Sequence, residues 1–461
     1  MAQSPLDTLR FDLTGQEQAQ VAQLLNSRTE QQVLPASAAQ EALWLLAQVE
    51  PDTAVYNLSV GLRLKGSLRP EILECSLQAI INRHESLRTT FELRDTGLVQ
   101  LVSAGTKFEL QVIDLTSCSD SNIETEVYSL AVIEAAKVFD LSRGPLFRIA
   151  VFKLRPDDHV LISVMHHIVS DGWSTEVFLR ELASNYAAFS SEVSYRLEPL
   201  PIQYGDYTLW QQESSQNEIF QRQIQYWKQK LAGSPPLLHL PYDRARPTER
   251  TSTGRTQTVT LDSGLVEALK VVAQRNGATF FMLMLAAFAV LLYRYSGQTD
   301  ILIGVPVAGR DQVETEALIG LFVNTLVLRV DLAGNPRFST LLAQVRNTML
   351  EALANEDVPF GRLVQELQPV RSLSYHPIFQ VMFATFKEPV QWRPFGDLAA
   401  IPYVVNTATS RFDLSSALIE GTEDHWWIRL EYDTALFDDD RMTRMLGHYN
   451  QLLRSLADAT S

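Results

Sequence analysis

The length of the chain limits its fold more than any other feature of the sequence. The chain has 461 residues, which exceeds what one ordinary hydrophobic core supports, because single cores stop growing at roughly 250 to 300 residues. The sequence contains no short repeat, low-complexity tract or long block of like charges, which disfavours repeat architectures and disordered linkers. Two lobes of roughly 200 residues each are therefore predicted.

Charge and cysteine content restrict the partners. The 54 acidic side chains outnumber the 39 basic ones, giving a formal net charge of −15, which repels nucleic acid phosphates and anionic membrane surfaces. Cys75 and Cys118 are the only cysteines and form no Cys-x-x-Cys pair, so cysteine builds no zinc site, disulfide framework or redox motif. We expect no nucleic acid partner and a cytoplasmic location.

No segment has the pattern of a membrane anchor. The most apolar stretch, residues 280–293, falls several residues short of the roughly 20 that a membrane helix needs. Thr279 is a suitable N-cap before it and Gly297 stands beyond its end, which predicts a buried core helix. Residues 1–13 lack the basic start and apolar run of a secretory signal. No membrane partner is expected.

Hydrophobic periodicity indicates a mixed α/β chain. The expected helices are residues 38–48, 70–84, 263–276, 280–293 and 338–354, and the expected strands are residues 56–64, 147–154, 159–166, 300–307, 322–330 and 426–432. Arg155-Pro156-Asp157-Asp158 provides hairpin turn chemistry between two of these strands. Residues 214–254 are rich in Gln, Pro, Arg and Ser and are expected to be a connector that forms no single regular element.

Residues 166–172, HHIVSDG in one-letter code, are the segment most suited to chemistry, because histidine moves protons near neutral pH. They follow a predicted strand and precede a helix that Ser174 can cap, with Glu176 in its first turn. Two histidines on a strand point to opposite sides, and Gly172 permits backbone geometry closed to other residues. In the structural alternative, backbone carbonyls satisfy both histidines and Asp171 caps the helix. Adjacent histidines without a further ligand disfavour a metal site.

Seven segments in order along the chain carry further motifs. They are residues 37–46 (SAAQEALWLL), 83–91 (RHESLRTTF), 165–174 (MHHIVSDGWS), 204–210 (YGDYTLW), 319–326 (IGLFVNTL), 355–360 (NEDVPF) and 371–383 (RSLSYHPIFQVMF). In these segments and this order, the chain resembles the condensation domains of non-ribosomal peptide synthetases, the HHxxxDG family. The first segment departs from the family pattern, which normally has an arginine near Ala42. Several segments also have a packing interpretation, such as an aromatic patch at residues 204–210.

The resemblance implies an α/β fold of two chloramphenicol-acetyltransferase-like lobes in a V-shaped pseudo-dimer with a tunnel between them. Residues 1–190 would form the lobe that carries HHIVSDG, and residues 191–461 the second lobe. The implied reaction is amide bond formation between a donor acyl or peptidyl thioester and an acceptor aminoacyl thioester. Carrier proteins would deliver both on phosphopantetheine arms, so the domain itself needs no cofactor and no metal. The expectation of no cofactor agrees with the sequence, because no P-loop or Gly-x-Gly-x-x-Gly motif follows a predicted strand.

The resemblance also implies partners and residue roles. The expected partners are an upstream donor and a downstream acceptor peptidyl carrier protein and a neighbouring adenylation domain, with the domain itself a monomer. His167 is the catalytic candidate, which takes the amine proton or holds the amine, and the Gly172 N–H contributes to an oxyanion site. His166, Asp171 and Arg310 are expected to be structural, with a buried ion pair between Asp171 and Arg310.

Four further residues are candidates for lining the tunnel or positioning substrate: Arg88, Trp173, Ser174 and Asn324. Two of them also have a structural interpretation. Arg88 lies where a helix end is expected to meet a strand, and Asn324 lies on a predicted core strand where its side chain can hydrogen-bond to backbone.

The motifs leave several activities open. The histidine pair excludes heterocyclising relatives, which have aspartate there, and recruitment-type relatives, which lose the second histidine; epimerising relatives differ in the first segment and need an additional glutamate. The pattern is most similar to the subtype that joins an L-donor to an L-acceptor, and a starter subtype that N-acylates the first amino acid stays open. A free-standing acyltransferase using a soluble acyl thioester would need a basic patch at one tunnel mouth. A non-enzymatic docking module is disfavoured by the intact motif.

Overall fold

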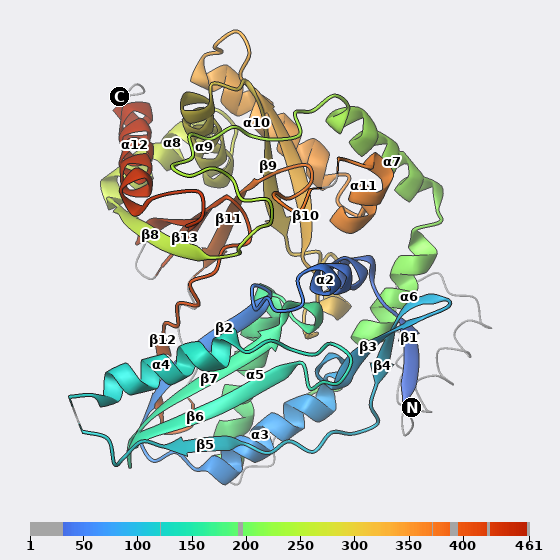
Figure 1. Cartoon of the computed structure of the whole chain (residues 1–461), viewed down its shortest axis with the longest axis vertical. Coiled ribbons are helices and arrows are strands. Elements are labelled where there is room, and N and C mark those ends of the chain that lie inside the picture. Colours follow the sequence, from blue (N-terminus) through green and yellow to red (C-terminus); the bar gives the residue numbers. More distant parts are fainter. Residues whose placement is uncertain are drawn as a thin grey trace. The chain divides into compact units, whose positions relative to one another are not determined.

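The computed structural model describes residues 31–119, 121–191, 197–370, 372–387, 395–421 and 425–458. The chain divides into two compact units, and most of their helices and strands are labelled in Figure 1. Of the described residues, unit 1 contains those up to Gln216 together with those of Arg310–Phe322 and Gln391–Thr407. Unit 2 contains Asn217–Gly309, Val323–Val390 and Ala408–Ser461. In each unit, helices cover a sheet.

Unit 1 is built on a five-stranded mixed sheet. Its strands, in spatial order, are β12 (Ala399–Tyr403), β2 (Asn57–Lys65), β7 (Asp158–His166), β6 (Phe147–Arg155) and β5 (Gln111–Asp114). The neighbouring strands run antiparallel, except that β5 is parallel to β6. The hairpin of β6 and β7 confirms the turn predicted at Arg155 to Asp158.

The central strand β7 is buried along its whole length. Leu161 and Met165 enter a core shared with α3 (Pro70–Arg83) and α5 (Gly172–Ser190). Val160, Ile162 and Val164 enter a second core that contains α4 (Ile123–Ala136). A strand buried on both faces needs apolar side chains at successive positions, which explains the nearly continuous apolar run before the histidines.

A smaller antiparallel sheet completes unit 1. Its strands are β1 (Gln32–Pro35), β4 (Gly97–Val102) and β3 (Thr89–Arg94). The remaining elements of the unit are α2 (Ala38–Val49), η2 (Glu85–Arg88), η3 (His167–Val169), α6 (Tyr204–Ser214) and η4 (Val313–Thr315). α6 packs against β1, and α2 packs against the turn η3 that continues from β7.

Unit 2 is built on a six-stranded sheet around one continuous apolar core. Its strands, in spatial order, are β10 (Asn324–Asp331), β9 (Asp300–Val307), β11 (Val381–Lys387), β13 (Leu414–Glu420), β14 (Trp426–Asp433) and β8 (Gly254–Leu261). Its helices are α7 (Glu218–Leu231), α8 (Ser263–Arg275), α9 (Phe280–Ser296), α10 (Phe338–Leu353), α11 (Phe360–Leu367) and α12 (Asp439–Asp458).

The predicted buried helix is α9. The hydroxyl of Thr279 accepts the N–H of Met282 at 3.2 Å, and Gly297 ends the helix in the left-handed region with φ 71°, so both predicted ends are confirmed. In the part of the chain that the structure describes, no single helix has the length and apolarity to cross a membrane. The helices α8 and α9 have that length and apolarity only when they are taken together, and the chain bends by 99° between them.

The predicted connector at residues 214–254 is wrong in part, because it contains α7. This helix begins after the N-cap Asn217 and buries Trp227 in the core of unit 2. Its apolar residues Phe220, Ile224, Trp227 and Leu231 stand at helical spacing. The surrounding glutamines and lysines obscure that spacing when the segment is judged by composition alone.

The division of the chain into units also differs from the expected one, which had a single boundary between residues 190 and 191. α6 stays with unit 1, and two later segments return to it. β12 returns because it pairs with β2 at the edge of the unit 1 sheet. Residues 310–322 return because they bond to the beginning of α5. Contacts between segments so distant along the chain leave no local pattern in the sequence.

The sheets of the two units repeat one arrangement. In unit 1, β5 is parallel to β6, β6 forms a hairpin with β7, and β7 is antiparallel to β2. In unit 2, β11 is likewise parallel to β13, β13 forms a hairpin with β14, and β14 is antiparallel to β8. The helix after the hairpin packs on the helix after the fourth strand in both cases, α5 on α3 and α12 on α8. Two related lobes are the simplest description of this repeat.

Candidate active site

The end of β7 carries the first histidine into packed surroundings. His166 is the last residue of the strand, and its backbone N–H donates to the carbonyl of Leu146 at 2.9 Å. Its side chain is buried, with Nδ1 accepting the N–H of Ile168 at 3.1 Å and the ring edge-on to Phe139. His166 therefore supports the turn that follows it.

The second histidine begins that turn and is only half-buried. The backbone N–H of His167 donates to the carbonyl of Tyr56 at 2.8 Å, and its Nδ1 lies 2.8 Å from the carbonyl oxygen of Ser170. A carbonyl oxygen can only accept, so the geometry assigns the proton of the neutral ring to Nδ1. The lone pair of neutral His167 then lies on Nε2, as a group that accepts a proton requires.

Asp171 is the N-cap of α5, in agreement with the structural alternative for this residue. Its carboxylate accepts the backbone N–H of Ser174 at 2.8 Å and the Ser174 hydroxyl at 2.7 Å. The prediction that Ser174 caps the helix is wrong, because α5 already begins at Gly172. A carboxylate at the N-cap satisfies first-turn N–H groups and complements the positive end of the helix.

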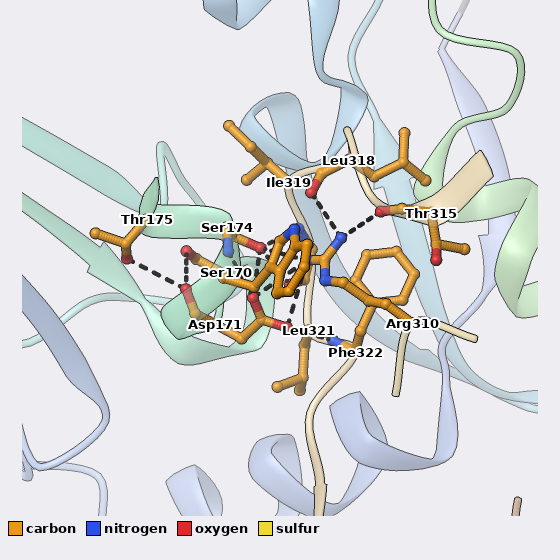
Figure 2. A network of polar contacts seen from close by, with 12 residues as sticks. Ser170, Asp171, Ser174, Thr175, Arg310, Thr315, Leu318, Ile319, Leu321 and Phe322 are labelled. Carbon is orange, nitrogen blue, oxygen red and sulfur yellow. Dashed lines mark hydrogen bonds and ion pairs between the residues drawn. The ribbon is translucent and has the colours of Figure 1, made fainter. Parts of the chain in front are cut away.

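Arg310 forms a buried ion pair with Asp171 inside unit 1, at 3.2 Å. Figure 2 shows the guanidinium between Asp171, the carbonyl of Leu318 and Thr315. It also donates to the Ser174 hydroxyl at 2.9 Å and lies over the Phe322 ring. Burial lowers the pKa of Arg310 from its usual value, and the charge of Asp171 opposes that shift. The pair fastens residues 310–322 to the beginning of α5.

Residues from other sequence motifs hold the same segment. The Ser86 hydroxyl donates to the Ile319 carbonyl at 2.7 Å, and Nδ1 of His84 accepts the Ile319 N–H at 3.3 Å. The Tyr204 hydroxyl donates to the Leu321 carbonyl at 2.7 Å. The term clamp is used below for residues 310–322, which include Arg310, together with their partners His84, Ser86, Asp171, Ser174 and Tyr204. Four of the seven motif segments, residues 83–91, 165–174, 204–210 and 319–326, contribute to the clamp.

Sequence reasoning missed the buried support behind the clamp. Glu181 on α5 is 2.9 Å from Nε2 of His84 and 3.0 Å from Nε of Arg83. Burial disfavours the charged form of Glu181, but His84 and Arg83 outweigh burial and lower its pKa. Glu181 lies outside the seven motifs. Its position on the face of α5 that is directed toward α3 was the only signal of its role.

The structure separates the remaining candidates. Ser174 is fully buried, and its hydroxyl also bonds to both the N–H and the carbonyl of Gly320. Arg88 donates to the carbonyls of Ile81, at 3.2 Å, and Ser103. Trp173 is 43% exposed while its Nε1 donates to the Glu316 carbonyl at 2.8 Å. Of these three, Trp173 alone presents a large apolar surface to solvent.

Asn324 lies in unit 2, at the first position of β10. Its Nδ2 donates to the carbonyls of Glu356 and Val358 at 2.8 and 2.9 Å, and its Oδ1 accepts the N–H of Phe360 at 2.9 Å. Asn324 thus joins the fifth motif segment to the sixth, which agrees with its structural interpretation.

Gly172 does not need the conformational freedom of glycine, so that prediction is wrong. Its φ is not in the left-handed region, and a Cβ placed on it would meet no atom within 4 Å. The open space at the N-terminus of α5 is therefore the notable property of this position. Among the described residues, no group of three or more His, Cys, Asp or Glu side chains is placed to hold a metal ion.

Comparison with known proteins places the chain in a family. The family model "Condensation domain" matches residues 30–461. The chain belongs to the condensation domain family. One component of the linear gramicidin synthase of Brevibacillus parabrevis is 43% identical over 96% of the chain, and malpibaldin synthetase of Mortierella alpina is 39% identical over 92%. The chain spans only 9% and 8% of these two relatives.

Solved structures agree with this assignment. The X-domain from teicoplanin biosynthesis is 31% identical with a TM-score of 0.84, over 92% of this chain and 95% of that one. The first condensation domain of the calcium-dependent antibiotic synthetase, 22% identical, has the same fold, with a TM-score of 0.74 over 92% and 96% of the two chains. The predicted mixed α/β class with acetyltransferase-like lobes is thereby confirmed. Condensation domains of non-ribosomal peptide synthetases form amide bonds, which is an acyl transfer.

Proposed function

We propose that the chain joins a donor acyl or peptidyl thioester to the amine of an acceptor aminoacyl thioester. Each reactant would be tethered to a carrier protein by phosphopantetheine, and the domain would hold no cofactor of its own. The observation that carries the proposal is the half-buried His167 ring, oriented by the Ser170 carbonyl so that Nε2 bears the lone pair. The L-donor and L-acceptor subtype is our first choice, and a starter subtype would use the same site.

The reaction needs positioning more than strong acid–base chemistry, because a thioester is already activated. The acceptor nitrogen attacks the donor carbonyl, the new C–N bond forms, and the C–S bond to the donor thiol breaks. Nε2 of His167 takes the proton that the nitrogen loses, or holds the amine, and that same proton passes to the departing thiolate. Two tethered reactants held together supply the larger share of the acceleration.

The beginning of α5 suits the oxyanion that forms during the attack. α5 is 19 residues long, and the backbone N–H groups at a helix N-terminus favour negative charge. The open space at Gly172 leaves room for a substrate group beside its N–H. We assign the oxyanion contact to Gly172 and substrate positioning to Trp173, which is exposed on the same turn.

The other candidates act through structure in this proposal. His166, Asp171, Arg310 and Ser174 hold the turn and the clamp, and Arg88 and Asn324 hold backbone in their own units. Loss of activity in an Asp171 variant would thus indicate that the fold is disrupted, and not that a catalytic group is missing. Removing one partner of a buried pair costs about 3 to 5 kcal/mol.

The relatives suggest the setting in which the chain works. They are long synthetases of which the chain spans a small part, and a four-domain non-ribosomal peptide synthetase has the same fold over 93% of this chain. We propose donor and acceptor carriers and an adjacent adenylation domain as partners, and a single copy of the domain as the working unit. The two thiols Cys75 and Cys118, neither in a disulfide, suit a cytoplasmic location.

A condensation assay with loaded donor and acceptor carriers tests the proposal. His167→Ala should lower the rate of amide formation by about 10²- to 10⁴-fold, whereas His448→Ala, at an exposed histidine of unit 2, should not. Equal product from both variants and the intact chain would remove the proposed role of His167. Product from a soluble acyl-coenzyme A donor in place of the carrier would favour the free-standing acyltransferase. Carrier binding without any product would favour a docking module.

A further inference from the structure

We infer that Gln40 is a positioning residue for His167, because its side-chain amide fixes the turn that carries the imidazole. The inference rests on the proposed catalytic role of His167. Gln40 lies in the first turn of α2, and it is 1% exposed. A fully buried amide with no partner would be costly, so its contacts are expected to be specific.

The amide of Gln40 bonds in two directions. Its Oε1 accepts the backbone N–H of Ser37 at 3.0 Å, as one half of a capping box. Its Nε2 donates to the carbonyl oxygen of Ile168 at 3.1 Å. One side chain therefore joins the beginning of α2 to the 3-10 turn that contains His167.

A second buried amide sets the orientation of the first. Oε1 of Gln100, on β4, lies 3.4 Å from Nε2 of Gln40. Nε2 of Gln100 donates to the Pro35 carbonyl at 2.8 Å and to the Thr208 hydroxyl at 3.3 Å. Because the oxygen of Gln100 can only accept, it favours the orientation of Gln40 in which nitrogen, not oxygen, faces Ile168.

The Ile168 carbonyl is close to the imidazole along the chain. It belongs to the residue after His167, and Ser170, whose carbonyl orients Nδ1, follows two residues later. The side chains of Ile168 and Val169 are fully buried, so the turn moves as one piece. Rotation of the Ile168 peptide would shift the Ser170 carbonyl and change which ring nitrogen keeps the proton. Gln40 resists that rotation.

A matched pair of variants separates this role from plain stability. Gln40→Glu keeps the size and the acceptor for the Ser37 N–H, but presents an oxygen to the Ile168 carbonyl. Ser37→Ala removes the other half of the same capping box, the bond from the Gln40 N–H, and a 2.9 Å contact with the Tyr204 hydroxyl, but it leaves both bonds of the Gln40 amide and does not touch the turn. We expect Gln40→Glu to lower kcat for amide formation by about 10- to 100-fold with little change in KM. Ser37→Ala should keep kcat close to that of the intact chain.

A second readout does not depend on turnover. In the full chain labelled with ¹⁵N-histidine, the ring signals of His167, assigned by their loss in His167→Asn, should report the proton on Nδ1. Gln40→Glu should shift these signals toward a mixture of the two tautomers, and Ser37→Ala should leave them in place. If Gln40→Glu folds poorly, Gln40→Met keeps the length, removes both polar atoms and carries the same expectation.

Two results would overturn the inference. One is a Gln40→Glu chain whose kcat and ring signals match those of the intact chain. The other is an equal fall of kcat in Gln40→Glu and Ser37→Ala without a change of tautomer, which would make Gln40 a stability residue only. If the intact chain forms no amide, the proposed function fails, and the ring signals alone still decide whether Gln40 positions His167.

Discussion

The junction between β7 and α5 in unit 1 and the junction between β14 and α12 in unit 2 have the same topology and different contents. Five residues connect strand to helix in each, residues 167–171 and residues 434–438. The unit 1 junction contains His167 and ends in the buried Asp171. The unit 2 junction contains no histidine, packs Leu436 and Phe437 into the core, and ends in Asp438, whose side chain is 54% exposed.

The difference shows how one backbone arrangement serves packing alone in unit 2 and packing together with chemistry in unit 1. In unit 2, apolar side chains anchor the loop, and the side chain of the terminal aspartate forms a surface ion pair with Arg244. In unit 1, Ile168 and Val169 of the loop are also fully buried, but the loop must leave one ring accessible, and polar groups add a second anchor from behind. A polar anchor is stable in the interior only when each group is bonded. This requirement accounts for the clamp and for the Gln40 network.

The largest expected contrast between the junctions is in their aspartates. Asp171→Ala should lower the free energy of unfolding by about 3 to 5 kcal/mol, because it leaves the Arg310 guanidinium buried without its counter-charge. Asp438→Ala should cost less than about 1 kcal/mol, because an exposed pair contributes little. Urea denaturation of both variants measures the two values. Equal losses would show that the junctions do not differ in the way described.

The pH dependence of stability gives a second contrast, with opposite signs. Burial lowers the pKa of His84 below its usual value of 6.5, so the unfolded chain binds a proton there more readily and the clamp weakens as the pH falls below 6.5. Burial raises the pKa of Asp433, at the end of β14, above 3.8, so this group weakens the fold as the pH rises past 3.8.

Thermal unfolding at pH 7 and pH 5 tests these signs. His84→Gln should unfold earlier at pH 7 yet lose less stability between pH 7 and pH 5 than the intact chain. Asp433→Asn should keep the loss between pH 7 and pH 5 that His84 causes. An unchanged pH dependence in His84→Gln would contradict the assignment of that loss to His84.

The smallest expected effect on stability is at Gly172. Gly172→Ala should change the free energy of unfolding by no more than about 0.5 kcal/mol, because the added Cβ meets no atom within 4 Å. Gly320→Ala is the matched variant in the clamp, where a Cβ would lie 2.1 Å from the Tyr204 ring. It should be clearly destabilising. A Gly172→Ala chain that is as unstable as Gly320→Ala would mean that the space beside α5 is filled.

Much of the fold follows from local signals in the sequence. Thr279 and Gly297 mark both ends of α9, and the predicted strand at residues 300–307 is β9 with the same bounds. The prediction failed where two signals competed at the start of α5. Asp171 and Ser174 are both good N-cap residues, and the buried Arg310 favours the aspartate. The expected elements also omit α4, whose apolar side chains spread around the helix, with Val127 buried and Ile133 exposed.

The site was predictable only in part for a related reason. The ion pair of Asp171 with Arg310 follows from the family resemblance and is present in the structure. The bonds from Ser86 to Ile319 and from Tyr204 to Leu321 join residues far apart in the chain. Such contacts depend on the tertiary fold, and the periodicity of a single segment contains no record of them.

The return of two late segments to unit 1 has a consequence for the order of synthesis. Asp171 must wait for Arg310, 139 positions later, before its carboxylate meets a cation, and the edge of the five-stranded sheet stays open until Tyr403 has left the ribosome. Domains usually complete folding from the N-terminus as they are made. Here the half that is translated first is finished only when most of the other half has emerged. A chimaera made by exchanging halves at a single cut would therefore inherit an unfinished first half.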